Sequence, residues 1–399
     1  MHLSAFEHSK PCYAGGGLVN LMASLGQAFD VPSRHYNPLV FAGAGELATR
    51  LCQARTVVLW VVDGLGDSDL RNPVAGALAR DRLTALDSVF PATTAAAITT
   101  FMTGMAPREH AVTGWFVYLH ELGAVTAWLP FGPRVGKGQW ARLLPESVEL
   151  LKRESLFDRM RADAHLIQPK WLINTPYSKA TRGKLTRCHG INSLSGLVKR
   201  IGTIARSRSR SRRRFVYAYW PDLDSLRHRH GVNSPQAQAE FEHIEAAYRR
   251  LLGILAGTDS LLLVTADHGL VDTGDDAVIK LEDHPDLAAM LALPLCGEPR
   301  AAYAYLRPGT EADFDAYVSE HLGDVCAALP SADMLASGWF GPGPEHPQLR
   351  RRIGDRVLLP ASGWVIKDRL PGEEQFNQIG VHGGGSYAER QVPLISPVL

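Results

Sequence analysis

Four short apolar runs, widely separated in the sequence, do most to limit how this chain can fold. Each is five to seven residues long, which is the length of a strand, and none alternates with charged residues. Runs of this kind are typical of strands buried on both faces of a mainly parallel sheet. The four runs are Thr56–Val62, Phe215–Trp220, Leu261–Thr265 and Ala301–Leu306.

Helical patterns lie between these runs, and the clearest extends from Pro235 to about Ala256. Its apolar side chains repeat at helical spacing, Ser234 is suited to the N-cap, and Gly257 follows its end. Strands that alternate with helices predict a three-layer α/β/α sandwich around a mainly parallel sheet. In such sheets the functional residues collect at the carboxyl ends of the strands.

The strand–helix rhythm weakens between about Gly114 and Ala205, a stretch rich in Trp, Pro, Lys and Arg. We interpret residues 118–205 as an inserted cap that covers the functional site, with an irregular part of the core as the alternative. Residues 1–50 are then an N-terminal extension that packs on the core. Residues 51–117 and 206–399 form the first and second parts of that core.

Composition argues against several classes of protein. The net charge is +1, so no overall field draws the molecule to nucleic acid or to acidic membranes. The five cysteines are scattered without a CxxC pair, which argues against a thiolate zinc site and fits a reducing compartment. The N-terminus lacks a signal-peptide pattern and no window is apolar enough to span a membrane, so we expect a cytoplasmic protein.

One basic run has six arginines between Arg206 and Arg214. In a nucleic-acid-binding protein such a run would contact several phosphates. The alternative is a solvated helix end, where cations suit the helix dipole, and we favour that interpretation. We therefore expect no nucleic-acid partner, and no pattern in the sequence predicts an oligomeric state.

Polar residues follow two of the predicted strands directly. Asp63 ends the first run and precedes Gly64, a pattern that also occurs in ordinary turns. The third run leads into Asp267 and His268, which are both common metal-ligand types and can face one cation where the strand ends. A capping aspartate and a surface histidine are the alternative for this pair.

Three more candidate ligands lie after the second run and near the C-terminus. Asp224 and His228 are four residues apart, so one helical turn places both on one face, aimed at one ion. His382 precedes three glycines, which allow the backbone to approach another group closely. A lone histidine is usually structural, but this context favours a ligand.

The segment Phe90–Gly104 predicts a helix that begins at a hydroxyl residue and ends near Gly104. A helix N-terminus offers free N–H groups and partial positive charge, which suit a phosphoryl group. The alternative is an N-cap threonine that only stabilises the helix.

Together, and in this order, these segments resemble the alkaline phosphatase superfamily, most closely its type I phosphodiesterase/nucleotide pyrophosphatase branch. The ordered set is far more specific than any one piece. The matching pieces lie between Val61 and Ile395 and are VVDGLG, FPATTAAAITTFMTG, MAPREHAVTGW, DLDSLRHRHG, TADHG, GVHGGG and SYAERQVPLI. The resemblance implies a hydrolase of small-molecule phosphoesters that acts through a covalent phosphothreonine at a two-metal site.

The resemblance also implies a role for each matching residue. One divalent cation would be held by Asp224, His228 and His382. The other would be held by Asp63, Asp267 and His268 together with the nucleophile, Thr94. The distances of Thr94 from Pro91 and Thr103 match those of the family's nucleophile, and those of Thr93 do not. We expect zinc, with manganese or iron as alternatives.

The chain departs from the family at two points. Many members carry an asparagine after the nucleophile that contacts the phosphoryl oxygen, whereas Ala95, Ala96 and Ala97 follow Thr94 here. No Arg or Glu matches the phosphate-binding Arg and third-metal Glu of true alkaline phosphatases. These differences favour phosphodiesters, with phosphomonoesters or phosphonates as the alternative substrates.

Overall fold

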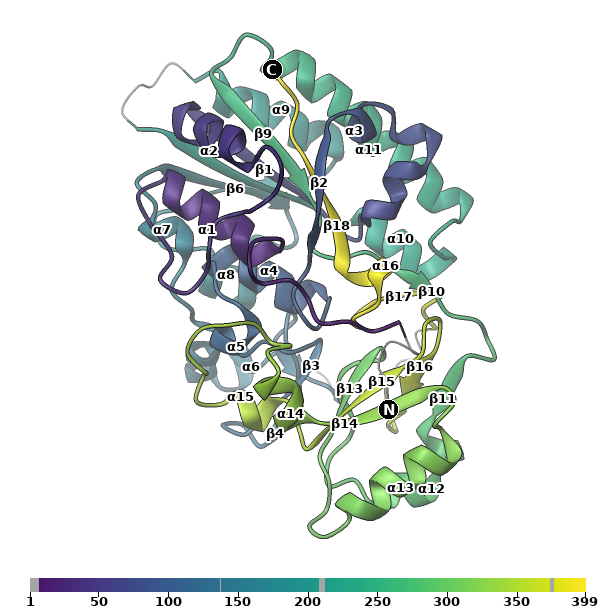
Figure 1. Ribbon diagram of the computed structural model, residues 1–399. Helices are drawn as coiled ribbons and strands as arrows, with labels where there is room; N and C mark the ends of the chain where they lie inside the picture. Colours follow the sequence, from purple (N-terminus) through teal and green to yellow (C-terminus); the bar gives the residue numbers. More distant parts are fainter. Residues whose placement is uncertain (1–6, 137, 208–211, 374–376) are drawn as a thin grey trace.

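The computed structural model describes residues 7–136, 138–207, 212–373 and 377–399. Two sheets of seven strands organise this part of the chain, one in the upper half and one in the lower half of Figure 1. Residues 208–211 of the basic run lie outside the described residues. Among the residues that are described, no helix is both long and apolar enough to cross a membrane.

The upper sheet has the strand order β2-β18-β9-β1-β8-β6-β7. Five neighbouring strands, from β9 to β7, run parallel, and β18 lies antiparallel between β9 and β2. In chain order the strands are β1 (Thr56–Val62), β2 (Arg82–Asp87), β6 (Asp163–Pro169), β7 (Arg187–Ile191), β8 (Arg214–Trp220), β9 (Ser260–Thr265) and β18 (Gln391–Ile395).

Helices cover both faces of the upper sheet, and this explains why every residue of β1 and β8 is buried. One layer contains α1 (Leu18–Ala28), α2 (Ala44–Gln53), α4 (Thr94–Thr103), α7 (Leu156–Arg159) and α8 (Pro176–Thr181). The other contains α3 (Gly76–Arg80), α9 (Leu194–Ala205), α10 (Asp222–His230) and α11 (Pro235–Leu255). The predicted α/β/α sandwich is confirmed.

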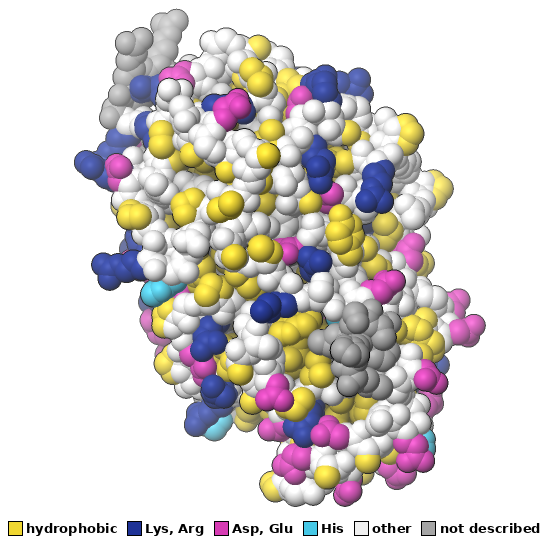
Figure 2. All heavy atoms as spheres, in the orientation of Figure 1, with side chains coloured by type: hydrophobic (Ala, Val, Ile, Leu, Met, Phe, Trp, Pro, Cys, Tyr) yellow, Lys and Arg dark blue, Asp and Glu magenta, His cyan; other side chains and the backbone are white. Residues whose placement is uncertain are grey.

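The lower sheet is antiparallel, with the strand order β14-β15-β13-β12-β3-β4-β5. Its strands are β3 (Phe116–Leu119), β4 (Ala124–Ala127), β5 (Gly132–Pro133), β12 (Cys296–Glu298), β13 (Ala301–Ala304), β14 (Cys326–Pro330) and β15 (Arg356–Pro360). Helices α12 (Pro285–Ala289) and α13 (Glu311–His321) lie at the lower end of Figure 1. Acidic side chains are frequent in this region of Figure 2, whereas Lys and Arg are spread over the displayed face.

Short elements complete the fold. Two strand pairs lie outside the main sheets, β10 (Val271–Asp272) with β17 (Gly380–Val381), and β11 (Val278–Lys280) with β16 (Val365–Lys367). The remaining short α-helices are α5 (Pro107–His110), α6 (Trp140–Leu143), α14 (Ser331–Ala336), α15 (Leu349–Arg352) and α16 (Tyr387–Arg390).

The two sheets divide the chain differently from the boundaries drawn on the sequence. Within residues 118–205, β4 and β5 belong to the lower sheet, whereas β6, β7 and α9 belong to the upper one. The apolar run at Ala301–Leu306 forms β13 of the antiparallel sheet and not a strand of the parallel one. The reason is that β13 pairs antiparallel with β12 on one side and with the distant β15 on the other, and no local pattern reveals the second pairing.

A buried ion pair joins the lower half to the loop that carries His382. Arg300 Nη2 lies 2.9 Å from Glu389 Oε2, and neither side chain is exposed. Glu389 also accepts hydrogen bonds from the Gly384 amide (2.7 Å) and the Ser386 hydroxyl (2.6 Å). Burial opposes the charge of Glu389, but Arg300 lowers its pKa to about 2.

We expect Glu389→Gln to lower the free energy of unfolding by about 3–5 kcal/mol, because it leaves the charge of Arg300 buried without a carboxylate to balance it. The folded-state pKa of Glu389 is depressed, so its contribution should be complete above its ordinary pKa of 4.5 and be lost as the pH falls toward 2. Urea denaturation across this pH range measures the loss.

The matched control is Glu149→Gln, which removes an ion pair with Lys152 whose side chains are both more than half exposed. Screening by water makes such pairs weak, so this change should cost less than about 1 kcal/mol. Equal losses in the two variants would contradict the role given to Glu389.

Candidate active site

Three adjacent strands bring the candidate aspartates to one edge of the upper sheet. Strands β9, β1 and β8 lie side by side, and Val61 pairs with Thr265 as Val62 pairs with Trp220, so the strands end at similar levels. Asp63 follows β1 directly, and Asp267 follows β9 after one residue. Asp224 lies in the first turn of α10, which begins just beyond β8.

Helix α10 and the glycine-rich loop deliver two histidines to the same edge. His228 lies one turn after Asp224, and its Nε2 is 3.2 Å from Asp224 Oδ2. The Nε2 atom of His382 is 3.9 Å from Asp224 Oδ1. Gly64 turns the chain with a φ of 73°, and a Cβ there would lie 3.0 Å from the Cβ of Asp224, so glycine permits this approach.

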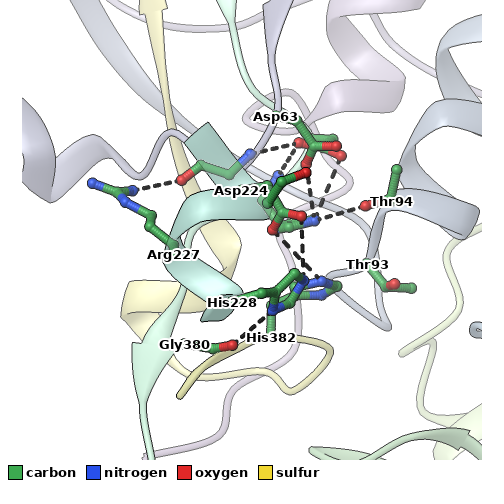
Figure 3. Close-up of polar contacts among 12 residues, drawn as sticks. Asp63, Thr93, Thr94, Asp224, Arg227, His228, Gly380 and His382 are labelled. Carbon is green, nitrogen blue, oxygen red and sulfur yellow. Dashed lines mark hydrogen bonds and ion pairs between the residues drawn. The ribbon is translucent and has the colours of Figure 1, made fainter. Parts of the chain in front are cut away.

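His268 contacts both sides of the cluster, whose labelled members Asp63, Asp224 and His382 lie close together in Figure 3. Its Nε2 is 3.4 Å from Asp63 Oδ1 and 3.5 Å from Asp267 Oδ2. The same nitrogen is 3.1 Å from Oγ1 of Thr94, the first residue of α4. The His268 ring also stacks on His382, with centroids 3.7 Å apart. All seven residues named from the sequence therefore lie together.

The ligand atoms form two overlapping groups, and the atoms of each group lie within 4.8 Å of one another. One group contains Asp63, Asp267 and His268, and the other contains Asp224, His268 and His382. His268 thus lies between the two sets that the resemblance implies, and His228 approaches the second set through Asp224.

Burial and neighbouring charges shift the pKa values of different members of this cluster in opposite directions. Burial raises the pKa of Asp63 well above its ordinary value, and the neighbouring Asp267 and Asp224 raise it further. Burial would also raise the pKa of Asp224, but His228 and His382 hold it below its ordinary value. Burial opposes protonation of His228, yet Asp224 raises the pKa of that imidazole to about 9.

The histidines are oriented as metal ligands usually are. In each ring Nδ1 lies within hydrogen-bond distance of a backbone carbonyl, that of Gly380 for His228 (2.7 Å), Gly269 for His268 (3.1 Å) and Ala92 for His382 (3.2 Å). When Nδ1 donates to such a carbonyl, Nε2 is left with a free lone pair. All three Nε2 atoms face the aspartates.

The aspartates carry oxygens that the described protein does not satisfy. Asp63 Oδ1, Asp224 Oδ1 and Asp267 Oδ2 are buried and have no hydrogen-bond partner among the described residues. Burying such oxygens without a partner is costly, and a divalent cation removes that cost. The donor set of imidazole nitrogens and carboxylate oxygens fits zinc, manganese or iron.

Two residues of the site were not identified from the sequence. The Tyr219 hydroxyl donates a hydrogen bond to Asp63 Oδ2. Its position in β8 offered a signal, because Tyr217 and Tyr219 alternate onto one face of the strand. Glu298 accepts a hydrogen bond from Thr93 and comes from β12 of the lower sheet, and no local pattern places it here.

A mainly apolar cavity opens beside Thr94. Side chains of α4, β6 and α8 line it, including Ile98, Met102, Leu166, Gln168, Tyr177 and Ser178. Tyr217 also lines the cavity, and its buried hydroxyl has no hydrogen-bond partner within the described ranges. The cavity can therefore accept a flat or apolar group that carries a hydrogen-bond acceptor.

The chain is similar in sequence to proteins of one family. Residues 57–384 match the model of the type I phosphodiesterase/nucleotide pyrophosphatase family. An uncharacterized pyrophosphatase/phosphodiesterase from Schizosaccharomyces pombe is 26% identical over 192 residues, which are 44% of this chain. The match spans 36% of the yeast protein, or about a third of its length.

Solved structures share the fold at low sequence identity. Murine ectonucleotide pyrophosphatase/phosphodiesterase 5 superposes with a TM-score of 0.62 at 16% identity, covering 85% of this chain and 87% of the murine one. A further structure of the murine protein is an inactive threonine-to-alanine variant in complex with AMP, with a TM-score of 0.61 at 14% identity, covering 85% and 87%. Phosphonoacetate hydrolase from Sinorhizobium meliloti gives 0.57 at 18% identity, covering 86% and 90%.

We expect the protein to bind about two divalent ions per chain, because the unsatisfied aspartate oxygens lie in two overlapping ligand groups. Adding zinc or manganese to chelator-treated protein should raise its stability, by about 2.7 kcal/mol at a hundredfold excess over the dissociation constant. Elemental analysis and thermal unfolding measure the two effects.

Asp267→Asn should lose at least one ion, since it weakens a ligand of the first group. Asp286→Asn changes an exposed carboxylate in α12 and should leave the metal content unaltered. Chelator-treated protein that gains neither stability nor bound ions would contradict the assignment.

Proposed function

Because this chain belongs to the type I phosphodiesterase/nucleotide pyrophosphatase family, we propose that it hydrolyses phosphoric esters with Thr94 as the nucleophile. The supporting observation is the 3.1 Å distance between Thr94 Oγ1 and His268 Nε2, at a nitrogen that also lies within 3.5 Å of Asp63 and Asp267. A hydroxyl beside such a cluster, at the start of a helix, suits attack on phosphorus.

The site would hold two divalent ions, with zinc as the first candidate. Asp63, Asp267 and His268 would bind one ion, and Asp224, His228 and His382 would bind the other. Bound ions of this kind lower the pKa of an attacking hydroxyl and offset charge on phosphoryl oxygens. The protein itself contributes the fixed orientation of these ligands. Tyr219 holds Asp63 through its hydroxyl, and backbone carbonyls hold the three histidine rings.

The reaction is a double displacement. Thr94 Oγ forms a bond to phosphorus as the bond to the leaving oxygen breaks, and the proton lost by Thr94 ends on the departing alcohol. Water then attacks the phosphothreonine, which restores the Thr94 hydroxyl and releases the phosphorylated product. A diester and one water thus yield a monoester and an alcohol.

Phosphodiesters and nucleotide pyrophosphates are the substrates that we propose. The cavity beside Thr94 has an apolar lining and the unpartnered Tyr217 hydroxyl, which suit a nucleobase. The AMP complex of the murine relative supports a nucleotide in a site of this fold. Phosphonates are the second candidate, since phosphonoacetate hydrolase shares the fold.

We expect Thr94→Ala to lower kcat roughly a thousandfold or more, since removing a nucleophile abolishes the covalent route. Bis(p-nitrophenyl) phosphate, p-nitrophenyl phosphate, p-nitrophenyl phenylphosphonate and dinucleotides form the assay panel, each with added zinc or manganese. Thr84→Ala, in β2, serves as the control and should keep full activity.

Metal content should stay unchanged in Thr94→Ala, which separates loss of the nucleophile from loss of the ions. A brief reaction of the active protein with a diester, quenched in acid, should show by mass spectrometry that Thr94 carries the phosphoryl group with its remaining ester substituent. Near-normal turnover by Thr94→Ala would refute the scheme.

We expect Ile98→Trp to discriminate between substrates, because Ile98 lines the cavity one turn from Thr94. Filling the cavity should lower kcat/KM for a dinucleotide at least tenfold relative to bis(p-nitrophenyl) phosphate. The ratio of the two values does not depend on the fraction of folded enzyme. An unchanged ratio would exclude the cavity as the nucleoside site.

A further inference from the structure

A buried carboxylate that this mechanism does not use lies next to the nucleophile's loop. Glu298 ends β12 of the lower sheet and is 7% exposed. Its Oε1 accepts hydrogen bonds from the Thr93 hydroxyl and the Trp115 backbone amide, both at 2.6 Å. Both donors are neutral, and burial raises the pKa of Glu298 to about 7. Burying this carboxylate beside neutral partners therefore lowers the stability of the fold, which suggests that it has a functional role.

Thr93 occupies the N-cap of α4 but does not cap it. Its backbone is extended, with φ −139° and ψ 150°, and its side chain makes no capping bond. A threonine at this position ordinarily accepts a hydrogen bond from the second or third amide of the helix. Here the hydroxyl donates to Glu298 instead. In Figure 3 only Thr94 of the two threonines has a dashed contact to the cluster.

Because the Thr93 hydroxyl bonds to Glu298, it accepts no hydrogen bond from the first backbone amides of α4. Within the described residues, the amides of Thr94, Ala95 and Ala96 have no acceptor, and the first backbone bond is from Ala97 N to Thr93 O at 2.9 Å. These amides belong to Thr94 and the two residues after it, and Thr94 Oγ1 shares His268 Nε2 as a neighbour with the unsatisfied oxygens of Asp63 and Asp267. Free amides at a helix N-terminus are suited to phosphoryl oxygens.

Resting on the function proposed above, we propose that Glu298 is a positioning residue that keeps the Thr93 hydroxyl out of the N-cap. The first-turn amides of α4 are thereby kept available to the non-bridging oxygens of the phosphoryl group.

A purely structural role for Glu298 predicts a different result. A link between β12 and the loop before α4 would change stability and leave turnover by the folded enzyme unaltered. The positioning role predicts lower kcat with little change in KM, because the amides contact charge that increases in the transition state. Measuring kcat and KM at equal concentrations of folded enzyme distinguishes the two roles.

The experiment compares Glu298→Leu, which releases the Thr93 hydroxyl, with Thr93→Val, which removes that hydroxyl and keeps the shape of the side chain. For the best diester of the panel, we expect Glu298→Leu to lower kcat roughly tenfold to a hundredfold, with KM within about threefold. Thr93→Val should keep most of kcat, because valine has no hydroxyl that could occupy the N-cap. The double variant Thr93→Val/Glu298→Leu should regain most of the kcat that Glu298→Leu loses, since no hydroxyl then competes for the amides.

Glu245→Leu is the matched control, because Glu245 is also buried and accepts backbone amides, those of Ala77 (2.7 Å) and Leu78 (3.1 Å), far from Thr94 in the fold. It should lower stability and leave kcat of the folded enzyme unchanged. Unchanged kcat in Glu298→Leu, or a double variant no better than Glu298→Leu, would overturn the inference while Thr94→Ala still tests the proposed function.

Affinity for inorganic phosphate, measured by calorimetry on the metal-loaded protein, gives a readout that needs no turnover. Glu298→Leu should weaken phosphate binding at least threefold with its metal content intact, and Thr93→Val/Glu298→Leu should restore the affinity. Equal phosphate affinity in Glu298→Leu and the unsubstituted protein would overturn the positioning role even if no ester in the panel is hydrolysed.

Discussion

Mutual repulsion among Asp63, Asp224 and Asp267 is the constraint around which the site is built. These carboxylates are buried together where β1, β8 and β9 end, so water cannot screen them. Their own neighbours offset the charge only in part, as the raised pKa of Asp63 shows. In the proposed mechanism, two divalent ions, bound also by three histidine nitrogens, offset the remaining negative charge of the aspartates. The repulsion among these buried carboxylates therefore favours the binding of cations.

The rest of the fold holds this cluster in place from two sides. The upper sheet supplies the strand ends, and the register of β9, β1 and β8 brings them to one level. The lower sheet reaches the site through Glu298, which contacts Thr93, and through Arg300, which pairs with Glu389 below the glycine-rich loop. A Cβ at Gly383 would lie 2.5 Å from the Cβ of Glu298, so the loop that carries His382 packs directly on that strand. The antiparallel half thus orders both the nucleophile's loop and one candidate ligand.

Local patterns predicted the elements of the upper half well. The four apolar runs are strands, α4 extends from Thr94 to Thr103 with Gly104 after it, and Ser234 caps α11. The assignment of strands to sheets was less successful, since β13 was expected among the parallel strands and lies in the antiparallel sheet. Burial makes a strand apolar in either sheet, so its sequence does not say which partners it meets. For the same reason residues 118–205 had no pattern that separated β4 and β5 from β6 and β7.

By itself, the sequence determined which residue types stand at the strand ends and in what order, because a strand, a helical turn and a glycine loop are each set by nearby residues. That order was enough to nominate Asp63, Thr94, Asp224, His228, Asp267, His268 and His382 as candidates. Only the tertiary structure decided that His268 lies between the two ligand groups, that Tyr219 holds Asp63, and that Glu298 takes the Thr93 hydroxyl. The last two contacts join residues 156 and 205 positions apart, and long-range packing rather than local preference brings such residues together.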